Sequence, residues 1–405
     1  MVVGTNARRN CLPVKGIRLA AVKSQIRYPD RLDLVLIEIA EEATVAGVFT
    51  QNAFCAAPVT VAKEHLQQKG SRYFLVNTGN ANAGTGTAGI AAALGCCQSV
   101  ADLTNVDFVE VLPFSTGVIG ESLPVDKIVA GIPDALAELS EDNWLSAAKG
   151  IMTTDTRPKI ATASVEINGQ QVHVSGIAKG AGMIKPNMAT MLSFVFTDAA
   201  IAEVLLDQLI NNVVNRSFNR ITVDGDTSTN DCCMLVATGR SGIALSDSDT
   251  NTLEKFTEVL DAVFHELATG LIRDAEGASK FITLRVINGT SSKECLQVGY
   301  AVAESPLVKT AFFAADPNWG RILAAVGRSG LEDLDIDCIK IYLGDVCLVS
   351  NGGVDLNYHE ARAQAVMNNE EIEVVIDLAR GDCIETIWTS DLSHDYIRIN
   401  AEYRT

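Results

Sequence analysis

The hydrophobic residues fall into two kinds of stretch that alternate along the first 280 positions. Short apolar runs bounded by turn residues are typical of buried strands, and they predict strands at 17–22, 32–39, 46–49, 73–76, 106–112, 191–196 and 221–223. Stretches with apolar residues every three or four positions are typical of amphipathic helices. They predict helices at 59–68, 125–137, 143–152, 204–214 and 251–272, and an alanine-rich helix that ends near residue 103. This mixture predicts an α/β fold.

Two further features complete the expected organisation. Residues 161–167 and 171–174 flank Asn168-Gly169, and an Asn-Gly pair between apolar runs predicts a hairpin. From residue 281 shorter elements follow, at 283–287, 306–313 (a helix), 321–326, 338–343, 346–349, 358–366 and 371–378, and a strand-like end at 390–400. We therefore expect an α/β domain at 1–280 and a smaller α+β domain at 281–405.

Composition narrows the class of protein. The 405 residues are 47% hydrophobic, and no apolar stretch approaches the length of a membrane-spanning helix. The first ten residues lack the apolar segment of a secretory signal, so we expect a cytoplasmic protein. A net charge of −18 argues against a nucleic-acid partner, which would need a basic face. An anionic substrate would need a local positive group.

The sequence motifs do not predict a metal-binding site. The ten cysteines form no C-x-x-C pair, and the five histidines form no H-E-x-x-H. We expect the cysteines to be buried, reduced thiols. The spaced aspartates of 224–231 resemble a calcium loop, but Thr229 stands where an EF-hand needs glycine and no Glu follows at position twelve. We interpret 224–231 as a polar loop near a site.

The segment 178–196 carries the most specific chemistry. A glycine-rich loop bearing Lys179 leads to Pro186, a small residue precedes a threonine at Ala189-Thr190, and an apolar run follows at once. This order places Thr190 at the mouth of a buried strand.

A threonine hydroxyl becomes a good nucleophile when its own N-terminal amine serves as the base. An α-amine titrates near ~7.7–8.0, so it is substantially neutral at pH 7. Thr190 gains that amine only if the Ala189-Thr190 bond is cut, which its own Oγ can start by attacking the preceding carbonyl. The same pattern also fits a glycine turn that enters a core strand, with Thr190 an ordinary strand residue.

Other motifs could complete a site. Residues 115–117 (STG) follow a predicted strand, where free backbone N–H groups can hold an oxyanion or cap a helix. The hydroxyls of 153–156 could bind a carboxylate or cap helices. Residues 84–89 match G-x-G-x-x-G, but seven residues separate the motif from the preceding strand, whereas a dinucleotide site needs its first glycine directly after the strand. A dinucleotide-dependent oxidoreductase is therefore a weak alternative.

Taken in order, the motifs resemble the ornithine acetyltransferase family, the bifunctional glutamate N-acetyltransferases of arginine biosynthesis. The segment 178–194 resembles the self-cleaving site of that family. The other matching segments are 115–120 (STGVIG), 152–155 (MTTD), 224–231 (DGDTSTND), 273–277 (RDAEG), 308–311 (VKTA), 316–321 (DPNWGR) and 399–405 (INAEYRT). They cover nearly the whole chain.

The resemblance implies a layered α/β sandwich of the type found in self-cleaving aminopeptidases. It implies cleavage at Ala189-Thr190 into chains 1–189 and 190–405 that assemble as α2β2. Thr190 would be the nucleophile, and Thr116 and Gly117 would form the oxyanion hole. The residues that would contact substrate are Thr153 (or its neighbour Thr154), Lys179, Thr190, Glu276, Asn400 and Thr405.

The implied reaction transfers acetyl from N-acetylornithine to glutamate through acetyl-Thr190, without a cofactor or metal. Acetyl-CoA is an additional donor in part of the family. The alternative is a hydrolase of the related self-cleaving aminopeptidase type, in which water intercepts the acyl-enzyme.

Overall fold

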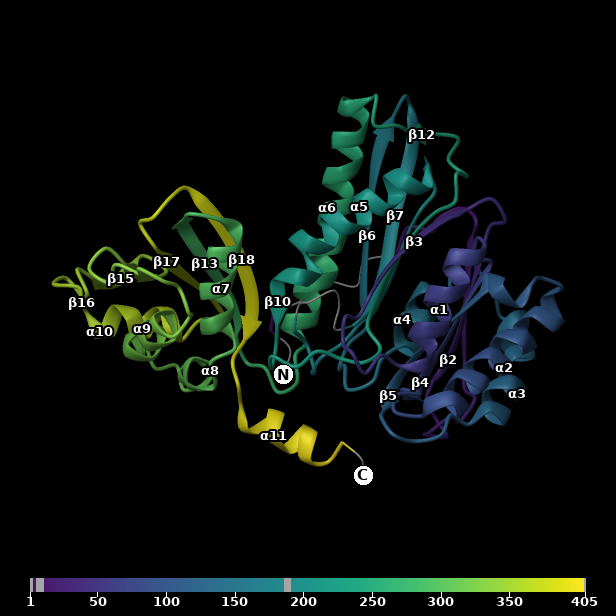
Figure 1. Ribbon diagram of the computed structural model, residues 1–405, viewed down its shortest axis with the longest axis horizontal. Helices are drawn as coiled ribbons and strands as arrows, with labels where there is room; N and C mark the ends of the chain where they lie inside the picture. Colours follow the sequence, from purple (N-terminus) through teal and green to yellow (C-terminus); the bar gives the residue numbers. More distant parts are fainter. Residues whose placement is uncertain (1–2, 5–10, 186–190, 404–405) are drawn as a thin grey trace. The chain divides into compact units, whose positions relative to one another are not determined.

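The computed structural model describes residues 3–4, 11–185 and 191–403 and shows a mixed α/β protein (Figure 1). The predicted positions Ala189, Thr190 and Thr405 lie outside these described residues. The chain divides into two compact units. The larger unit comprises residues 7–219 and 227–271, and the smaller unit comprises 1–6, 220–226 and 272–405.

Two sheets form the centre of the larger unit. The first has the order β1-β2-β4-β5 and consists of β1 (Ile17–Val22), β2 (Leu34–Ile39), β4 (Tyr73–Asn80) and β5 (Val111–Val118). The second has the order β3-β11-β8-β7-β6 and consists of β3 (Thr44–Phe49), β11 (Cys232–Ala237), β8 (Leu192–Thr197), β7 (Gln170–Lys179) and β6 (Lys159–Ile167). A separate pair joins β9 (Ala200–Ile201) and β12 (Ala244–Leu245).

The two sheets pack face to face through large apolar side chains. Phe74 and Phe114 of the first sheet contact Phe194 of the second, with ring centroids 5.8 and 5.1 Å apart. Trp144 packs edge-on against Phe196 at 5.6 Å. Such aromatic pairs add to the stabilisation from burial alone. All six residues of β8 are buried, because this strand lies inside its sheet and under the other. The strand that follows Thr190 is therefore firmly held.

Helices cover the outer faces of both sheets (Figure 1). Buried residues of α2 (Gly86–Thr104) and α3 (Val125–Ala137) share a core with the outward-facing residues of β2 and β4. On the second sheet, α5 (Glu203–Arg216) packs on β3 and β11, and Leu267 of α6 (Thr250–Arg273) lies over Gly176 of β7. Two shorter helices, α1 (Ala57–Gln68) and α4 (Trp144–Gly150), pack beside β5 and β1. The larger unit is thus a helix-sheet-sheet-helix sandwich, as predicted.

The smaller unit is built on one sheet with the order β10-β18-β13-β17-β14-β15-β16. Its strands are β10 (Ile221–Thr222), β18 (Cys383–Ser390), β13 (Phe281–Gly289), β17 (Glu371–Asp377), β14 (Lys340–Leu343), β15 (Val346–Ser350) and β16 (Gly353–Val354). Its helices are α7 (Ser292–Ala303), α8 (Pro306–Phe313), α9 (Trp319–Gly327), α10 (Glu360–Met367) and α11 (His394–Ala401).

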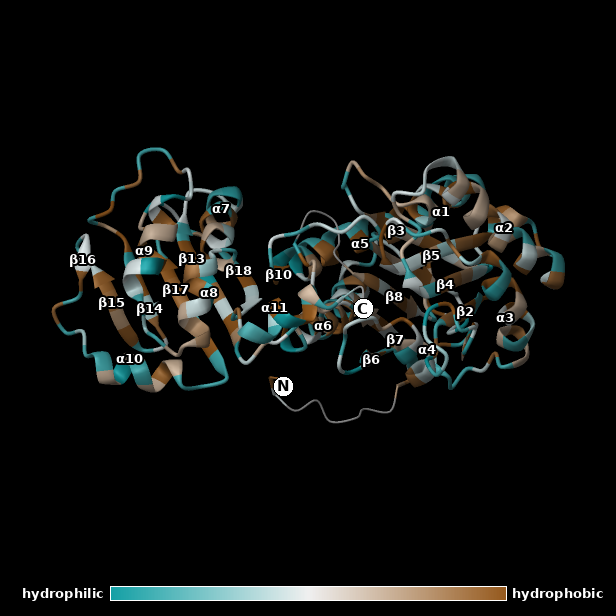
Figure 2. Ribbon diagram, turned by 90° about the horizontal axis from the view of Figure 1, so that it is seen from below, coloured by the Kyte–Doolittle hydropathy of each residue, from teal (hydrophilic) through white to brown (hydrophobic). Residues whose placement is uncertain are grey.

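Alternation along the central strands explains the core of the smaller unit. Ile372, Val374 and Ile376 of β17 are buried, while the alternate residues Glu371 and Glu373 are exposed. Successive strand residues face opposite sides, so one face of the sheet packs under helices. Figure 2 shows the many hydrophobic residues in the strands of both units.

Several local predictions are confirmed. The helices at 125–137 and 306–313 coincide with α3 and α8. The hairpin between β6 and β7 turns at Asn168 and Gly169, whose φ angles are 52° and 76°. Positive φ at both central residues is what a type I′ turn requires.

Two strand predictions are wrong. Residues 106–112 begin with a 3₁₀ turn at Phe108–Glu110, because Asp107 and Glu110 cap each other's backbone, and β5 starts only at Val111. Residues 390–400 are mostly helical, because the Ser393 side chain caps the first turn of α11. A capping side chain satisfies a backbone N–H that an isolated helix leaves unpaired.

No helix among the described ranges 3–4, 11–185 and 191–403 is both long and apolar enough to cross a lipid bilayer.

Candidate active site

The predicted oxyanion residues lie inside β5 rather than in a turn after a strand, which corrects the sequence expectation. Thr116 is buried, and Gly117 faces Gly79 of β4 at an irregular step in the β4–β5 register. Gly117 has a φ of 138°, and a Cβ there would lie 2.3 Å from the carbonyl carbon of Gly79. Only glycine fits so close a backbone approach.

The polar loop predicted at 224–231 is divided between the two units. Its residues 227–231 belong to the larger unit and support β5. The Asn230 side-chain amide donates to the carbonyl oxygens of Ala81, at 2.6 Å, and Ser115, at 2.9 Å. The Ser115 hydroxyl donates to the side-chain oxygen of Asn77 at 2.5 Å. Asn230 therefore ties the end of β4 to β5 directly before Thr116. The sequence motif indicated the loop but not this role of Asn230.

The predicted substrate residue Thr153 lies beside a buried carboxylate, Asp155. One Asp155 oxygen accepts from the Thr153 N–H at 3.0 Å. The other accepts from the Gly180 N–H at 2.8 Å and from the Lys159 ammonium. Burial alone would raise the pKa of Asp155, but Lys159, Lys179 and these hydrogen bonds lower it to about 2. An ionised Asp155 thus joins the segment after α4 to the end of β7.

Lys179 is the last residue of β7, not part of the loop that follows it. Its side chain is half-buried, and its positive charge lowers the pKa of one buried carboxyl, Asp155, and opposes the raised pKa of another, Asp231. Asp155 already has Lys159 as an ion-pair partner. The end of β7 therefore carries an ammonium whose charge acts on two buried carboxyls.

Asp231 is a buried carboxyl at the end of the predicted polar loop 224–231, and the sequence motif indicated no separate role for it. The next residue, Cys232, donates its N–H to the carbonyl of Met191 at 3.0 Å, and Met191 directly follows Thr190 in the chain. Burial raises the pKa of Asp231 well above its usual range, although Lys179 and hydrogen bonds to Ser228 oppose the rise. Its Oδ2 has no hydrogen-bond partner among the described residues. Its place directly before an apolar run was the sequence signal that could have found it.

Two predicted site residues meet in the smaller unit. The Asn400 side-chain amide of α11 donates to Glu276 Oε2 at 2.6 Å. Glu276 is only 8% exposed, so it is not the solvated charge that its position at a helix end could suggest. Glu276 and Asn400 belong to the smaller unit, whereas Thr116, Gly117, Thr153 and Lys179 belong to the larger one.

Side chains within and just before the G-x-G-x-x-G stretch occupy the space beside its glycines. The Thr85 hydroxyl donates to Asn82 Oδ1 at 2.8 Å, and Asn82 Nδ2 donates to the Gly89 carbonyl at 2.9 Å. A Cβ on Gly89 would lie 1.9 Å from the Thr85 hydroxyl. The glycine therefore makes room for this internal cluster. In the described part of the chain, no group of three or more His, Cys, Asp or Glu side chains is arranged to hold a metal ion.

Comparison with known proteins gives matches over nearly the full length. The ArgJ family matches residues 18–405. The arginine biosynthesis bifunctional protein ArgJ of Pseudomonas fluorescens (strain Pf0-1) is 54% identical over 408 residues, covering 100% of both chains. The protein of the same name from Methylococcus capsulatus is 57% identical over 393 residues, covering 97% of this chain and 96% of its own. A crystal structure of arginine biosynthesis bifunctional protein ArgJ from Bacillus halodurans matches with 36% identity and a TM-score of 0.50, covering 52% of this chain and 99% of that chain. This chain belongs to the ArgJ family.

Proposed function

We propose that this protein is a glutamate N-acetyltransferase of arginine biosynthesis, which moves acetyl from N-acetylornithine to glutamate. The observation that carries the proposal is the identity of 54% to an arginine biosynthesis bifunctional protein over the full length of both chains. Two features of the larger unit fit this reaction. Gly117 is closely packed in β5, the strand that carries the predicted oxyanion residues, and Lys179 ends β7.

The active form would arise by cleavage between Ala189 and Thr190, giving chains 1–189 and 190–405. The coverage of the Bacillus halodurans chain supports this, because that chain is matched over 99% of its length and yet spans 52% of this one. A product of cleavage near the middle would have that length. We propose that the two chains stay associated as α2β2 and act in the cytoplasm.

In the first half-reaction, Thr190 Oγ attacks the acetyl carbonyl of N-acetylornithine while its proton passes to the Thr190 α-amine. Thr116 and Gly117 would hold the oxyanion of the tetrahedral intermediate. The C–N bond then breaks, the α-nitrogen of ornithine takes the proton, and an acetyl ester remains on Thr190.

In the second half-reaction, the α-amine of glutamate attacks that ester. The C–O bond breaks, Thr190 Oγ regains a proton, and N-acetylglutamate leaves. The acetyl group passes only through Thr190, so the cycle needs no cofactor. Acetyl-CoA is the second donor to test.

Both substrates are amino acids, so the same groups can place each of them. Lys179 would bind the α-carboxylate, together with the hydroxyl of Thr153. The raised pKa of Asp231 favours its neutral form, which would lessen repulsion of a substrate carboxylate beside Lys179. Glu276, which Asn400 holds by a hydrogen bond, would bind a cationic amine, and Thr405 would complete the contacts.

Mass spectrometry of the denatured protein tests the mechanism first. We expect two species that correspond to 1–189 and 190–405, and one uncut species for Thr190→Ala. N-acetylornithine should add one acetyl group to the 190–405 chain, and glutamate should then remove it as N-acetylglutamate. A single full-length chain that is active would refute the role of the amine. If acetate were released in the absence of glutamate as fast as acetyl is transferred in its presence, the protein would instead be a hydrolase.

A further inference from the structure

Helix α11 carries the predicted site residue Asn400 but lacks a buried apolar anchor. None of its eight residues, His394–Ala401, all of which the structure describes, is buried. An isolated helix of this length is unstable in water, because nucleation is costly and few hydrogen bonds follow. The His394 ring contacts Phe313 of α8 edge-on, with ring centroids 5.5 Å apart, and polar contacts to the rest of the smaller unit add to this contact.

The chain before α11 is fastened to the segment just after Glu276. The Asp391 carboxylate accepts from the backbone N–H groups of Ser279 and Lys280, at 2.8 and 3.0 Å, and from the Ser279 hydroxyl at 2.5 Å. The Ser393 hydroxyl donates to the carbonyl of Gly277 at 2.7 Å. These contacts fix where the helix begins.

Gly277 lets the first turn of α11 lie directly on the backbone next to Glu276. Its φ is 69°, and a Cβ there would lie 2.5 Å from Ser393 Oγ and 2.6 Å from the Tyr396 nitrogen. Any side chain at this position would push α11 away. The start of the helix and the Glu276 carboxylate are thus held together by backbone packing.

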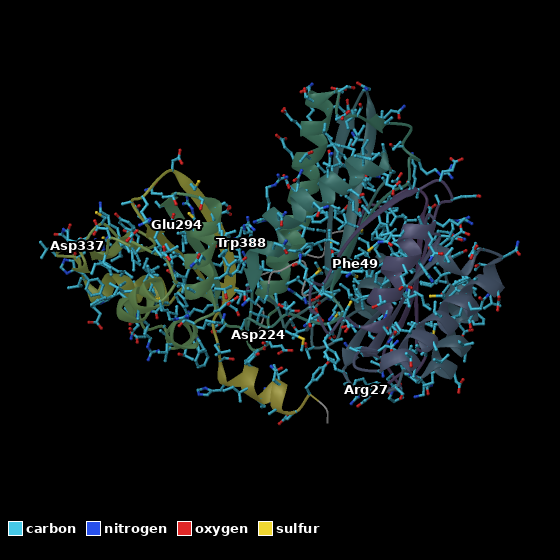
Figure 3. The ribbon with its side chains drawn as sticks, viewed as in Figure 1. Arg27, Phe49, Asp224, Glu294, Asp337 and Trp388 are labelled. Atoms are coloured by element: carbon cyan, nitrogen blue, oxygen red, sulfur yellow. The ribbon has the colours of Figure 1, made fainter. Side chains whose placement is uncertain are left out.

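Within α11 itself, Tyr396 forms a hydrogen bond with Asp224. The Tyr396 hydroxyl donates to Asp224 Oδ2 at 3.0 Å. Asp224 is labelled in Figure 3. Burial and the negative charge of Asp224 raise the pKa of Tyr396, so the phenol keeps its proton and remains a donor. Tyr396 and Asn400 are four residues apart and therefore lie on the same face of α11. Asn400 Nδ2 also donates to the carbonyl of Tyr396, at 3.0 Å.

A buried lysine faces the carboxylates that hold the tail. The Lys309 ammonium donates to the hydroxyl of Thr389, at 2.8 Å, and to the carbonyl of Ser390. Burial lowers its pKa to about 8, against the opposing charges of Asp391, Asp224 and Glu304. Lys309 thus supplies positive charge near both Asp391 and Asp224. This is a structural role for the 308–311 motif.

We propose that Asp224 and Tyr396 are positioning residues: their hydrogen bond docks α11 and so holds Asn400 against Glu276 for substrate binding. Their role would be exerted through α11 and Asn400. The inference deepens the proposed function and rests on it for its kinetic consequence. A partly undocked helix would bind substrate only in its docked fraction, so the apparent affinity would fall by that fraction.

Tyr396→Phe removes the hydroxyl and keeps the ring. A net intramolecular hydrogen bond shifts an equilibrium by roughly two- to tenfold. Because the apparent affinity follows the docked fraction, we expect KM for N-acetylornithine and for glutamate to rise by up to that factor, with kcat within about twofold of wild type. Asp224→Asn, whose side chain can still accept from the phenol, should change KM less. Tyr358→Phe makes the same chemical change at a residue that packs on the sheet core, and it should leave KM unchanged.

A double-mutant cycle separates positioning from general stabilisation. If Tyr396 acts through Asn400, Tyr396→Phe should have almost no further effect on KM in an Asn400→Ala background. Equal effects in both backgrounds would overturn the proposal, as would a Tyr396→Phe enzyme with wild-type KM.

Hydrogen exchange provides a readout that does not depend on activity. Tyr396→Phe should speed amide exchange in residues 394–401 by about the same two- to tenfold factor, with unchanged exchange in β13 and β17. Unchanged exchange in α11 would refute the docking role even if the protein were not an acetyltransferase. Faster exchange in α11 combined with no acetyl transfer by the wild type would refute the proposed function and leave the docking role intact.

Discussion

Gly117→Ala offers the sharpest test of the role proposed for β5, the strand that carries Thr116 and Gly117. The new Cβ would lie 2.3 Å from the Gly79 carbonyl carbon, 2.5 Å from the Asn80 nitrogen and 2.7 Å from the Gly79 Cα. All three are backbone atoms, so no side-chain rotation relieves the overlap, and β4 and β5 must move apart. The φ of 138° is also unfavourable for alanine.

The expected cost can be worked from these two effects. A strained backbone conformation costs about 1–3 kcal/mol, and overpacking a close contact costs about 1–3 kcal/mol. Gly117→Ala should therefore lower the free energy of unfolding by about 2–6 kcal/mol. Displacing an oxyanion donor should lower kcat by about 10²–10³-fold.

Gly120→Ala is the matched control. Gly120 follows the same strand and has a φ of 82°, but a Cβ at this position would meet no atom of the described residues within 4 Å. The variant should lose only about 1–2 kcal/mol for the left-handed conformation. Urea unfolding monitored by circular dichroism, together with kcat and KM for acetyl transfer, compares the two variants. The reasoning is refuted if Gly117→Ala is as stable and as active as Gly120→Ala.

Three further predictions concern the polar groups of the larger unit. Asn230→Ala leaves the carbonyls of Ala81 and Ser115 without their shared donor, so we expect a loss of about 2–4 kcal/mol in urea unfolding and a lower kcat, whereas Asn211→Ala on the exposed face of α5 should change neither. The pKa of Asp155 is about 2 in the folded protein, below its unfolded value, so the stability that it contributes is present above pH 4 and is lost as the pH falls toward 2. Over that window wild type should lose about 2 kcal/mol more than Asp155→Asn in acid titrations of unfolding, and parallel curves would contradict the assignment. The pKa of Asp231 is raised, so its contribution has the opposite sign and is lost as the pH rises. Asp231→Asn, which resembles the protonated acid, should lose less stability than wild type as the pH rises above about 4, the usual pKa of an aspartate in an unfolded chain; parallel stability curves would contradict the raised pKa of Asp231.

The local pattern of the sequence determined much of this protein. Helices α3 and α8 and the turn at Asn168-Gly169 follow from periodicity and turn chemistry, which act over a few neighbouring residues. The motifs around Thr190, Thr116 and Gly117 indicated the family without any knowledge of tertiary contacts. Capping by Asp107 and Ser393 was present in the sequence too, but the apolar residues around them favoured a strand.

Only the tertiary structure decided which distant groups meet. Asn400 reaches Glu276 across 124 positions, and Asn230 reaches Ser115 across 115. A hydrophobic pattern says which face of a strand is buried but not which strand lies beside it, so the order β3-β11-β8-β7-β6 could not be read from it. The pKa of Asp231 likewise depends on burial and on Lys179, from another strand. These properties arise from packing and charge between segments far apart in the chain, which is why the sequence pattern alone did not reveal them.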